Sequence, residues 1–295
     1  MAVGRDLKMR EWRIALPGRG PGEVSVLDLG PSSRPVDAVF LHANGFNANT
    51  YRRILAPLGA RYRILAYDQR GHGLSSLVAE PEGRVDWLDL RDDLLAFLGA
   101  VGARSVVLAG HSMGATACLL AAAATPATVP RLVLLDPVIL PRPLIETPND
   151  SPMISGALRR RPSFASREEA LASYRGRGAF RTWPEDILAD YVATGFRDLP
   201  GGGVTLACTP EWEASNYAAH AHDSWAALHA ATLPVDIFAA EVGSTFRREG
   251  APDLRDYAHL CVRNVTGSTH FLPMERPELV QSAMAEAIEG GKARD

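Results

Sequence analysis

The sequence predicts an α/β fold built on a mostly parallel central sheet. Two observations lead to this prediction: short apolar runs alternate with helix-like stretches along most of the chain, and the 295 residues are 46% hydrophobic and 22% charged. This length and composition suit one large domain, or one domain that carries an insertion. Alternating strands and helices are what a parallel sheet covered by helices on both faces requires.

Charge and cysteine content exclude several classes of protein. The net charge is −3 with no block of like charges, which gives no reason to expect nucleic acid or an anionic membrane as a partner. The charged N-terminus lacks the apolar segment of a signal peptide, and the longest apolar run near residue 112, 117–124, is too short to span a bilayer. A reducing cytoplasm is expected, because three distant cysteines indicate neither a disulfide framework nor a close-spaced metal site: Cys118, Cys208 and Cys261.

Apolar periodicity places the individual elements. The first two strands form a hairpin around the Pro/Gly-rich segment 17–22, and the later strands alternate with helices. Strands are predicted at 11–16, 23–29, 36–41, 63–67, 106–110, 132–136, 235–239 and 261–265, and helices at 50–58, 87–101, 113–124 and 277–288.

The chain is organised around residues 106–117, where a strand-like run turns abruptly into a run of small helix formers. Ser112 sits at the bend, between Gly110 and Gly114. This spacing is typical of a nucleophile elbow, because the serine takes a strained backbone conformation and the two glycines leave room for it. The buried strand before it and the Ala-rich helix after it supply the context that the motif requires. The helix amides would then point at a developing anion.

Between 138 and 231 the alternation stops, and proline, arginine and aromatic residues become frequent. We interpret this segment as an inserted helical cap, so that the core comprises residues 1–137 and 232–295. No internal repeat or low-complexity tract is found. Several cap aromatics are candidates to line a substrate pocket, although packing of the cap on the core explains aromatic residues at this density better: Phe180, Trp183, Tyr191, Trp212, Tyr217 and Trp225.

Four motifs, taken in order, resemble the α/β-hydrolase fold family, in particular its capped esterase and lyase-like members. They are His-Ala-Asn-Gly at 42–45, Asp-Gln-Arg-Gly-His-Gly at 68–73, the elbow at Ser112 and the segment 267–277. The resemblance covers nearly the whole chain outside the cap. In proteins that this chain resembles, the loop that matches 68–73 supports the site structurally, so no catalytic role is expected for Arg70 or His72.

His270 is the predicted general base. It follows the last strand, and the chain order of serine first and histidine last is that of this fold. A serine hydroxyl is a weak nucleophile, so an imidazole must take its proton during attack.

The acid of the triad departs from the commonest family pattern. The resemblance implies an aspartate a few residues past the seventh strand, but that loop, 240–245, reads Ala-Glu-Val-Gly-Ser-Thr. Two carboxylates remain as candidates, Asp136 and Glu241. Asp136 ends the sixth strand, and the resemblance to the family supports this position, because certain haloalkane dehalogenases carry their acid there. Either would hold the imidazole in its productive tautomer. We favour Asp136, because its Asp-Pro strand end is rigid.

The oxyanion hole is predicted from the main-chain amides of Met113 and Asn44, with Gly45 as an alternative to Asn44. The predicted function is that of a carboxylesterase-like serine hydrolase, which cleaves a small, moderately apolar ester or related acyl substrate through an acyl-enzyme, without metal or organic cofactor. Carbon–carbon bond hydrolysis, thioester hydrolysis, acyl transfer and perhydrolysis use the same apparatus. A receptor of this fold that binds a small ligand without turnover remains a different class. Epoxide hydrolases and dehalogenases are disfavoured, because they resemble this fold but use aspartate in place of Ser112.

Overall fold

The computed structural model describes residues 9–141, 151–248 and 253–292. The charged N-terminal residues 5–8 and the stretch 142–150 of the predicted cap lie outside these ranges. The main sheet confirms the predicted strands. They are β1 (Met9–Ala15), β2 (Glu23–Leu29), β3 (Ala38–Leu41), β4 (Ile64–Tyr67), β5 (Val107–His111), β6 (Leu132–Leu135), β10 (Val235–Val242) and β11 (Leu260–Thr269).

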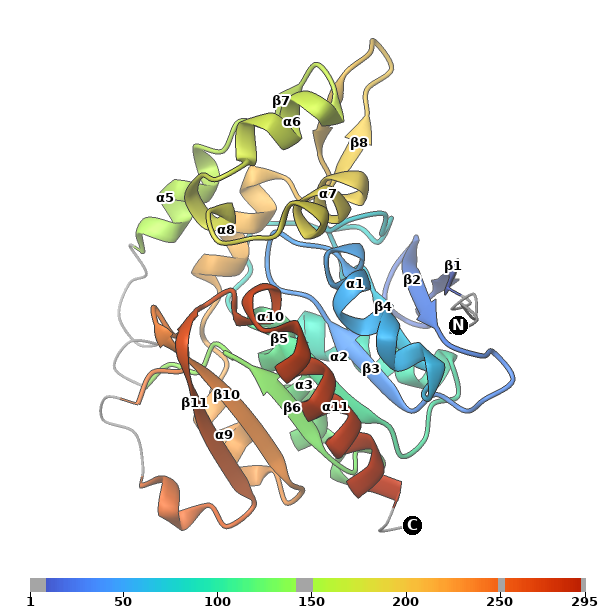
Figure 1. The fold of residues 1–295 in the computed structure, drawn as a ribbon, viewed down its shortest axis with the longest axis vertical. Helices are drawn as coiled ribbons and strands as arrows, with labels where there is room; N and C mark the ends of the chain where they lie inside the picture. The colour runs from blue at the N-terminus through green and yellow to red at the C-terminus, as the bar shows by residue number, and fades with distance from the viewer. Residues whose placement is uncertain (1–8, 142–150, 249–252, 293–295) are drawn as a thin grey trace, which may run out of the picture.

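The sheet is eight-stranded, in the order β1-β2-β4-β3-β5-β6-β10-β11 (Figure 1). Strand β2 runs antiparallel to both β1 and β4, whereas every pairing from β4 to β11 is parallel. The carboxyl ends of these parallel strands therefore meet at one edge of the sheet. In open parallel sheets this is the edge at which binding sites form.

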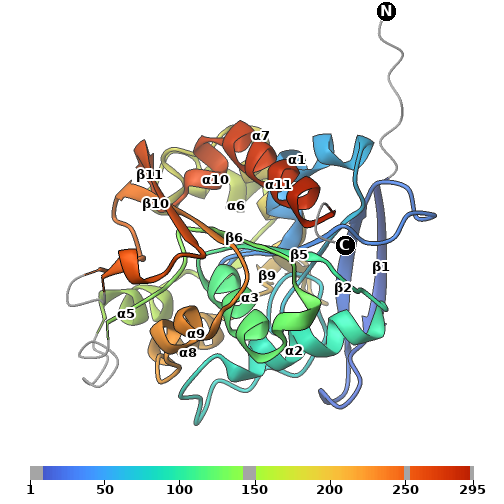
Figure 2. The same ribbon diagram turned by 90° about the horizontal axis from the view of Figure 1, so that it is seen from below.

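Helices cover both faces of the sheet (Figure 2). Helices α2 (Leu88–Ala100), α3 (Met113–Ala124) and α9 (Ser224–Ala230) lie on one face, and α1 (Arg52–Leu55), α10 (Leu272–Glu275) and α11 (Pro277–Lys292) on the other. The helix predicted at 50–58 is instead split into a 3-10 turn η1 (Ala48–Tyr51), α1 and a second turn η2 (Ala56–Ala60). Pro57 explains the break after α1, because it has no amide to continue the helix. Within the described part of the chain, no helix is both long enough and apolar enough to cross a membrane.

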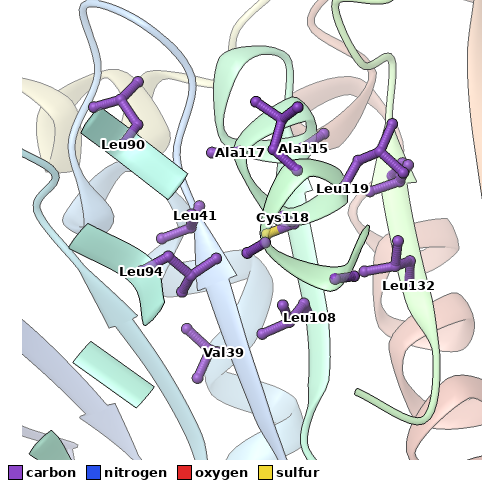
Figure 3. Packing of buried hydrophobic residues seen from close by; sticks show 14 of the residues in the cluster. Val39, Leu41, Leu90, Leu94, Leu108, Ala115, Ala117, Cys118, Leu119 and Leu132 are labelled. Carbon is purple, nitrogen blue, oxygen red and sulfur yellow. The ribbon is translucent and has the colours of Figure 1, made fainter. Parts of the chain in front are cut away.

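Side chains of the strands alternate between two apolar clusters. In β6, Leu132 and Leu134 belong to the cluster beneath α2 and α3, whereas Val133 and Leu135 belong to the cluster beneath α1 and α11. A strand buried on both faces reads as a continuous apolar run, as β6 does. Figure 3 shows the first cluster, which joins β3, β5 and β6 to the two helices through Val39, Leu41, Leu90, Leu94, Leu108, Ala115, Leu119 and Leu132.

The inserted segment lies over the site edge of the sheet (Figure 1). Its helices are α5 (Pro152–Leu158), α6 (Arg167–Tyr174), α7 (Glu185–Thr194) and α8 (Pro210–Ala218). The helical interpretation is incomplete, because the segment also contains a small antiparallel sheet in the order β7 (Ser163–Phe164), β9 (Val204–Leu206), β8 (Phe196–Asp198). Strands of two or three residues are too short to show a period in the sequence. Further 3-10 turns are η3 (Pro126–Thr128), η4 (Gly178–Phe180) and η5 (Leu254–Asp256).

Helix α7 seats the cap on the core. Side chains of the loop after β3 bind its main-chain oxygens: Asn49 Nδ2 donates to Asp190 O at 2.8 Å and Asn47 Nδ2 to Tyr191 O at 3.0 Å. Helix α9, by contrast, contacts α3, and its Trp225 and Leu228 belong to the apolar cluster of that core face. The predicted boundary at 231 therefore assigns to the cap a helix that packs on the core. We propose that the cap ends near 218 instead.

Candidate active site

Ser112 lies at the tight turn between β5 and α3, with φ 55° and ψ −120°. A residue with a side chain rarely adopts a positive φ, so the turn stores strain. The flanking glycines make it possible. A Cβ at Gly110 would lie 2.6 Å from the carbonyl carbon of Gly114, and one at Gly114 would lie 2.5 Å from the main-chain oxygens of Leu41 and His42. Strand and helix thus approach too closely for a side chain at either position.

Ser112, His270 and Asp136 form one chain of hydrogen bonds. His270 follows β11, and its Nε2 lies 3.1 Å from Ser112 Oγ. Its Nδ1 lies 2.6 Å from Asp136 Oδ2. Only 7% of Ser112 is exposed, and Asp136 is fully buried. The distances allow proton transfer from a hydroxyl to an imidazole that a carboxylate orients.

Asp136 ends β6 and is held from several sides. Its Oδ1 accepts from the Ala240 amide at 2.8 Å and from Ser244 Oγ at 2.5 Å, and its Oδ2 accepts from the Thr245 amide at 3.0 Å. Burial alone would raise the pKa of this carboxyl. The hydrogen bonds, above all that from His270, outweigh burial and leave the pKa of Asp136 below its ordinary value. The carboxylate is therefore both ionised and fixed in orientation.

Glu241, the alternative acid, lies on the exposed end of β10 and turns to a different partner. Its Oε2 accepts from the Gly267 amide at 2.7 Å, whereas His270 Nδ1 is bonded to Asp136.

Ser244 and Thr245 are site residues that the motifs do not reveal. The one signal for them is that hydroxyl residues stand in the loop where an aspartate is expected. That loop holds the acid instead of supplying it.

The two predicted oxyanion amides come from different elements. Met113 is the first residue of α3, where an amide has no carbonyl partner within the helix. Asn44 follows β3, and among the described residues its amide has no hydrogen-bond partner. The amide of Gly45, the alternative donor, is already given to His72 Nε2 at 3.0 Å. This geometry favours Asn44 over Gly45.

Cap helix α8 holds the side chain of Asn44. Its Nδ2 donates to Glu213 O at 3.0 Å, and its Oδ1 accepts from Asn216 Nδ2 at 2.9 Å. Asn216 is fully buried. Cap and core are therefore joined at the loop that carries one of the predicted oxyanion amides.

The buried histidines of the two motif loops have structural contacts. His42 Nε2 accepts from the Gln69 amide at 2.9 Å, and His72 Nδ1 donates to Arg70 O at 2.9 Å. Burial lowers the pKa of His42 to about 4 and that of His72 well below its ordinary value. Both rings are therefore neutral, and their hydrogen bonds hold the two motif loops together. Arg70 forms an ion pair with Asp93 at 2.7 Å.

Some of the predicted cap aromatics gather beside the triad. Trp183 has its ring centroid 4.9 Å from that of Phe46 and 5.9 Å from that of Phe271, which neighbours His270. Phe180 and Tyr191 pack against Trp183 and Phe46. Tyr217 shares a side-chain hydrogen bond with Asn44 on the predicted oxyanion loop. The other two pack on different partners: Trp212 lies under Arg84, and Trp225 packs on Phe246.

Comparison with known proteins identifies the family to which the chain belongs. The chain is 27% identical over 256 residues to 2-(acetamidomethylene)succinate hydrolase of Mesorhizobium japonicum, covering 85% of this chain and 87% of that protein. The crystal structure of E-2-(acetamidomethylene)succinate hydrolase superposes with a TM-score of 0.78 at 24% identity, covering 96% of this chain and 100% of that one. A thioesterase domain from the curacin biosynthetic pathway gives a TM-score of 0.75 at 17% identity, covering 94% and 99%. The sequence profile of the Alpha/beta hydrolase family matches residues 38–283, and the chain belongs to this family.

Proposed function

We propose that this protein is a serine hydrolase that cleaves a small, moderately apolar ester or related acyl substrate. The observation that supports the proposal is the hydrogen-bonded chain from Ser112 Oγ through His270 to Asp136 Oδ2, at 3.1 and 2.6 Å. These are the groups, in the order, that nucleophilic acyl transfer needs.

In the proposed mechanism, Ser112 Oγ attacks the acyl carbon while His270 Nε2 takes its proton. Asp136 keeps the remaining proton on Nδ1 and stabilises the imidazolium that forms. The amides of Met113 and Asn44 receive the negative oxygen of the tetrahedral intermediate. His270 then gives its proton to the leaving alcohol, which leaves an acyl-enzyme on Ser112. A water molecule, deprotonated by the same imidazole, releases the acid and restores the serine.

Charge balance beside the oxyanion loop favours a substrate without free carboxylates. A Cβ on Gly45 would lie 2.9 Å from Glu213 Oε1 and 3.4 Å from Arg160 Nη1, so this ion pair adjoins the loop. Arg160 also donates to the Tyr191 hydroxyl at 2.9 Å. A substrate carboxylate that bound Arg160 would have to displace Glu213, which costs a buried ion pair. The relative named above acts, by its name, on a succinate derivative, and the paired state of Arg160 argues for a less charged substrate here.

The test is turnover of p-nitrophenyl esters of graded acyl length, with a succinate half-ester as the charged comparison. Ser112→Ala should lose about 10⁴-fold in kcat while unfolding at the same temperature, because triad members act as a unit. Ser155→Ala is the matched control, since its hydroxyl donates to Pro152 O in cap helix α5. Tight binding of such ligands with neither a burst nor turnover would indicate a receptor and contradict the proposal.

A further inference from the structure

His111, the last residue of β5, directly precedes Ser112 and is fully buried. Its two ring nitrogens bind two segments that are distant in the sequence. Nε2 lies 2.7 Å from the main-chain oxygen of His270, and Nδ1 lies 2.7 Å from the hydroxyl of Tyr51. One imidazole therefore contacts the loop of the predicted base and the turn that follows the oxyanion loop.

The direction of each hydrogen bond follows from the chemistry of the partners. A carbonyl oxygen only accepts, so His111 Nε2 carries the hydrogen and Nδ1 must accept from the Tyr51 hydroxyl. The Tyr51 oxygen in turn accepts from the Ala43 amide at 3.2 Å. The chain runs from the Ala43 amide to Tyr51, to His111 and to the His270 carbonyl.

Electrostatics keep this arrangement in one state. Burial, with the neighbouring His270 ring, lowers the pKa of His111 to about 3, and burial raises the pKa of Tyr51. The imidazole is thus neutral and the phenol protonated at any pH at which the protein is expected to work. Ring packing restricts both groups as well, because Tyr51 lies against Phe40 and His111 against His270, with centroids 4.8 and 4.9 Å apart.

We propose that His111 is a positioning residue, which fixes the main chain of His270 and, through Tyr51, the oxyanion loop relative to Ser112. The inference rests on the proposed function, because it assigns these segments to base and oxyanion hole. Ala43 precedes Asn44, and His111 precedes Ser112, so the hydrogen-bonded chain reaches the proposed nucleophile, the base and the oxyanion loop within one residue of the group that acts. A displacement of about 1 Å between such groups costs on the order of 10²-fold in rate.

The experiment compares kcat and KM of His111→Phe, His111→Gln and Tyr51→Phe. Phenylalanine keeps a ring but neither hydrogen bond. Glutamine offers a donor for the His270 carbonyl, but its acceptor oxygen is on the same terminal carbon, so it places no acceptor where Nδ1 met the Tyr51 hydroxyl. We expect His111→Phe to lower kcat by roughly 30- to 100-fold with KM nearly unchanged, and the other two by roughly 3- to 10-fold. The double variant with Tyr51→Phe should be no slower than His111→Phe alone, because both act through one chain.

Two matched controls separate positioning from packing. His222→Phe replaces another buried histidine, one stacked on Trp87, and Tyr62→Phe removes a hydroxyl bonded to Glu289 near the C-terminal helix. Both should keep the wild-type kcat. Proton NMR supplies a second readout, because the downfield resonance of the proton between His270 Nδ1 and Asp136 should shift in His111→Phe and stay in place in His222→Phe.

A kcat for His111→Phe equal to that of His222→Phe, with an unshifted proton, would overturn the inference. If His111→Phe does not fold, wild-type kcat in both His111→Gln and Tyr51→Phe overturns it instead. A wild-type protein that turns over no ester would contradict the proposed function, and the NMR comparison would then decide the positioning role by itself.

Discussion

The carboxyl edge of the sheet and the cap hold their polar groups in different ways. At the sheet edge, Asp136 is bound by main-chain amides and short hydroxyl side chains that come from strand ends and tight loops. In the cap, Arg160 is held by long side chains, those of Glu213 and Tyr191. Sites built on rigid elements are positioned more exactly than sites built on long side chains. The groups around Asp136 are therefore held by the core backbone and short side chains, whereas Arg160 depends on long side chains of the cap, and we expect substitutions at Arg160 to leave the hydrogen bonds of Asp136 in place.

Replacing the carboxylate at the sheet edge should have the largest effect on turnover. Asp136→Asn should lower kcat by about 10⁴-fold, because the amide no longer holds the productive tautomer of His270. Glu241→Gln is the control, and it should change kcat little, since Glu241 bonds the Gly267 amide. Steady-state kinetics at matched thermal stability is the measurement. A large loss in Glu241→Gln together with a small one in Asp136→Asn would reverse the assignment of the acid.

Substitutions at two glycines, one in the core turn and one in the cap, should have smaller effects, on the free energy of unfolding. Gly114→Ala should destabilise the protein by about 3 kcal/mol, because the added Cβ meets main-chain oxygens of β3 and its loop at 2.5 Å. Gly156→Ala, inside cap helix α5, meets nothing within 4 Å and should stabilise by up to about 1 kcal/mol. Urea unfolding of both variants gives the free energies. Equal effects would show that the core turn is not the constrained element described above.

Sequence patterns were sufficient for the core because most of its strands are continuous apolar runs and its turn needs glycine at two fixed positions. The spacing around Ser112 and the late position of His270 pointed to residues that the structure brings within hydrogen-bond distance. Position alone does not separate Asp136 from Glu241, since both lie at the ends of predicted strands at the same edge. In the structure His270 Nδ1 lies 2.6 Å from Asp136, and Ser244 and Thr245 bond the same carboxylate along a loop path that local sequence does not encode.

The cap and the buried polar groups were less predictable for physical reasons. Strands β7, β8 and β9 are too short to show a period, and the antiparallel register of β7 on β9 depends on contacts across about 40 residues of sequence, as between Ser163 and Thr205. The composition of helix α9 resembles that of the cap, but its buried side chains pack in the same apolar cluster as α3. Likewise, the bonds of His111 to Tyr51 and to the His270 carbonyl join three separate segments, and no spacing in the chain indicates them.

Labelling with a fluorophosphonate, followed by peptide mapping of the adduct, tests the central claim most directly. The reagent reacts with a serine only when a neighbouring base activates it and an oxyanion hole receives the phosphoryl oxygen. We expect a single adduct on Ser112, which is absent in Ser112→Ala and forms far more slowly in Asp136→Asn. An adduct on another residue, or ester turnover that persists in Ser112→Ala, would contradict it.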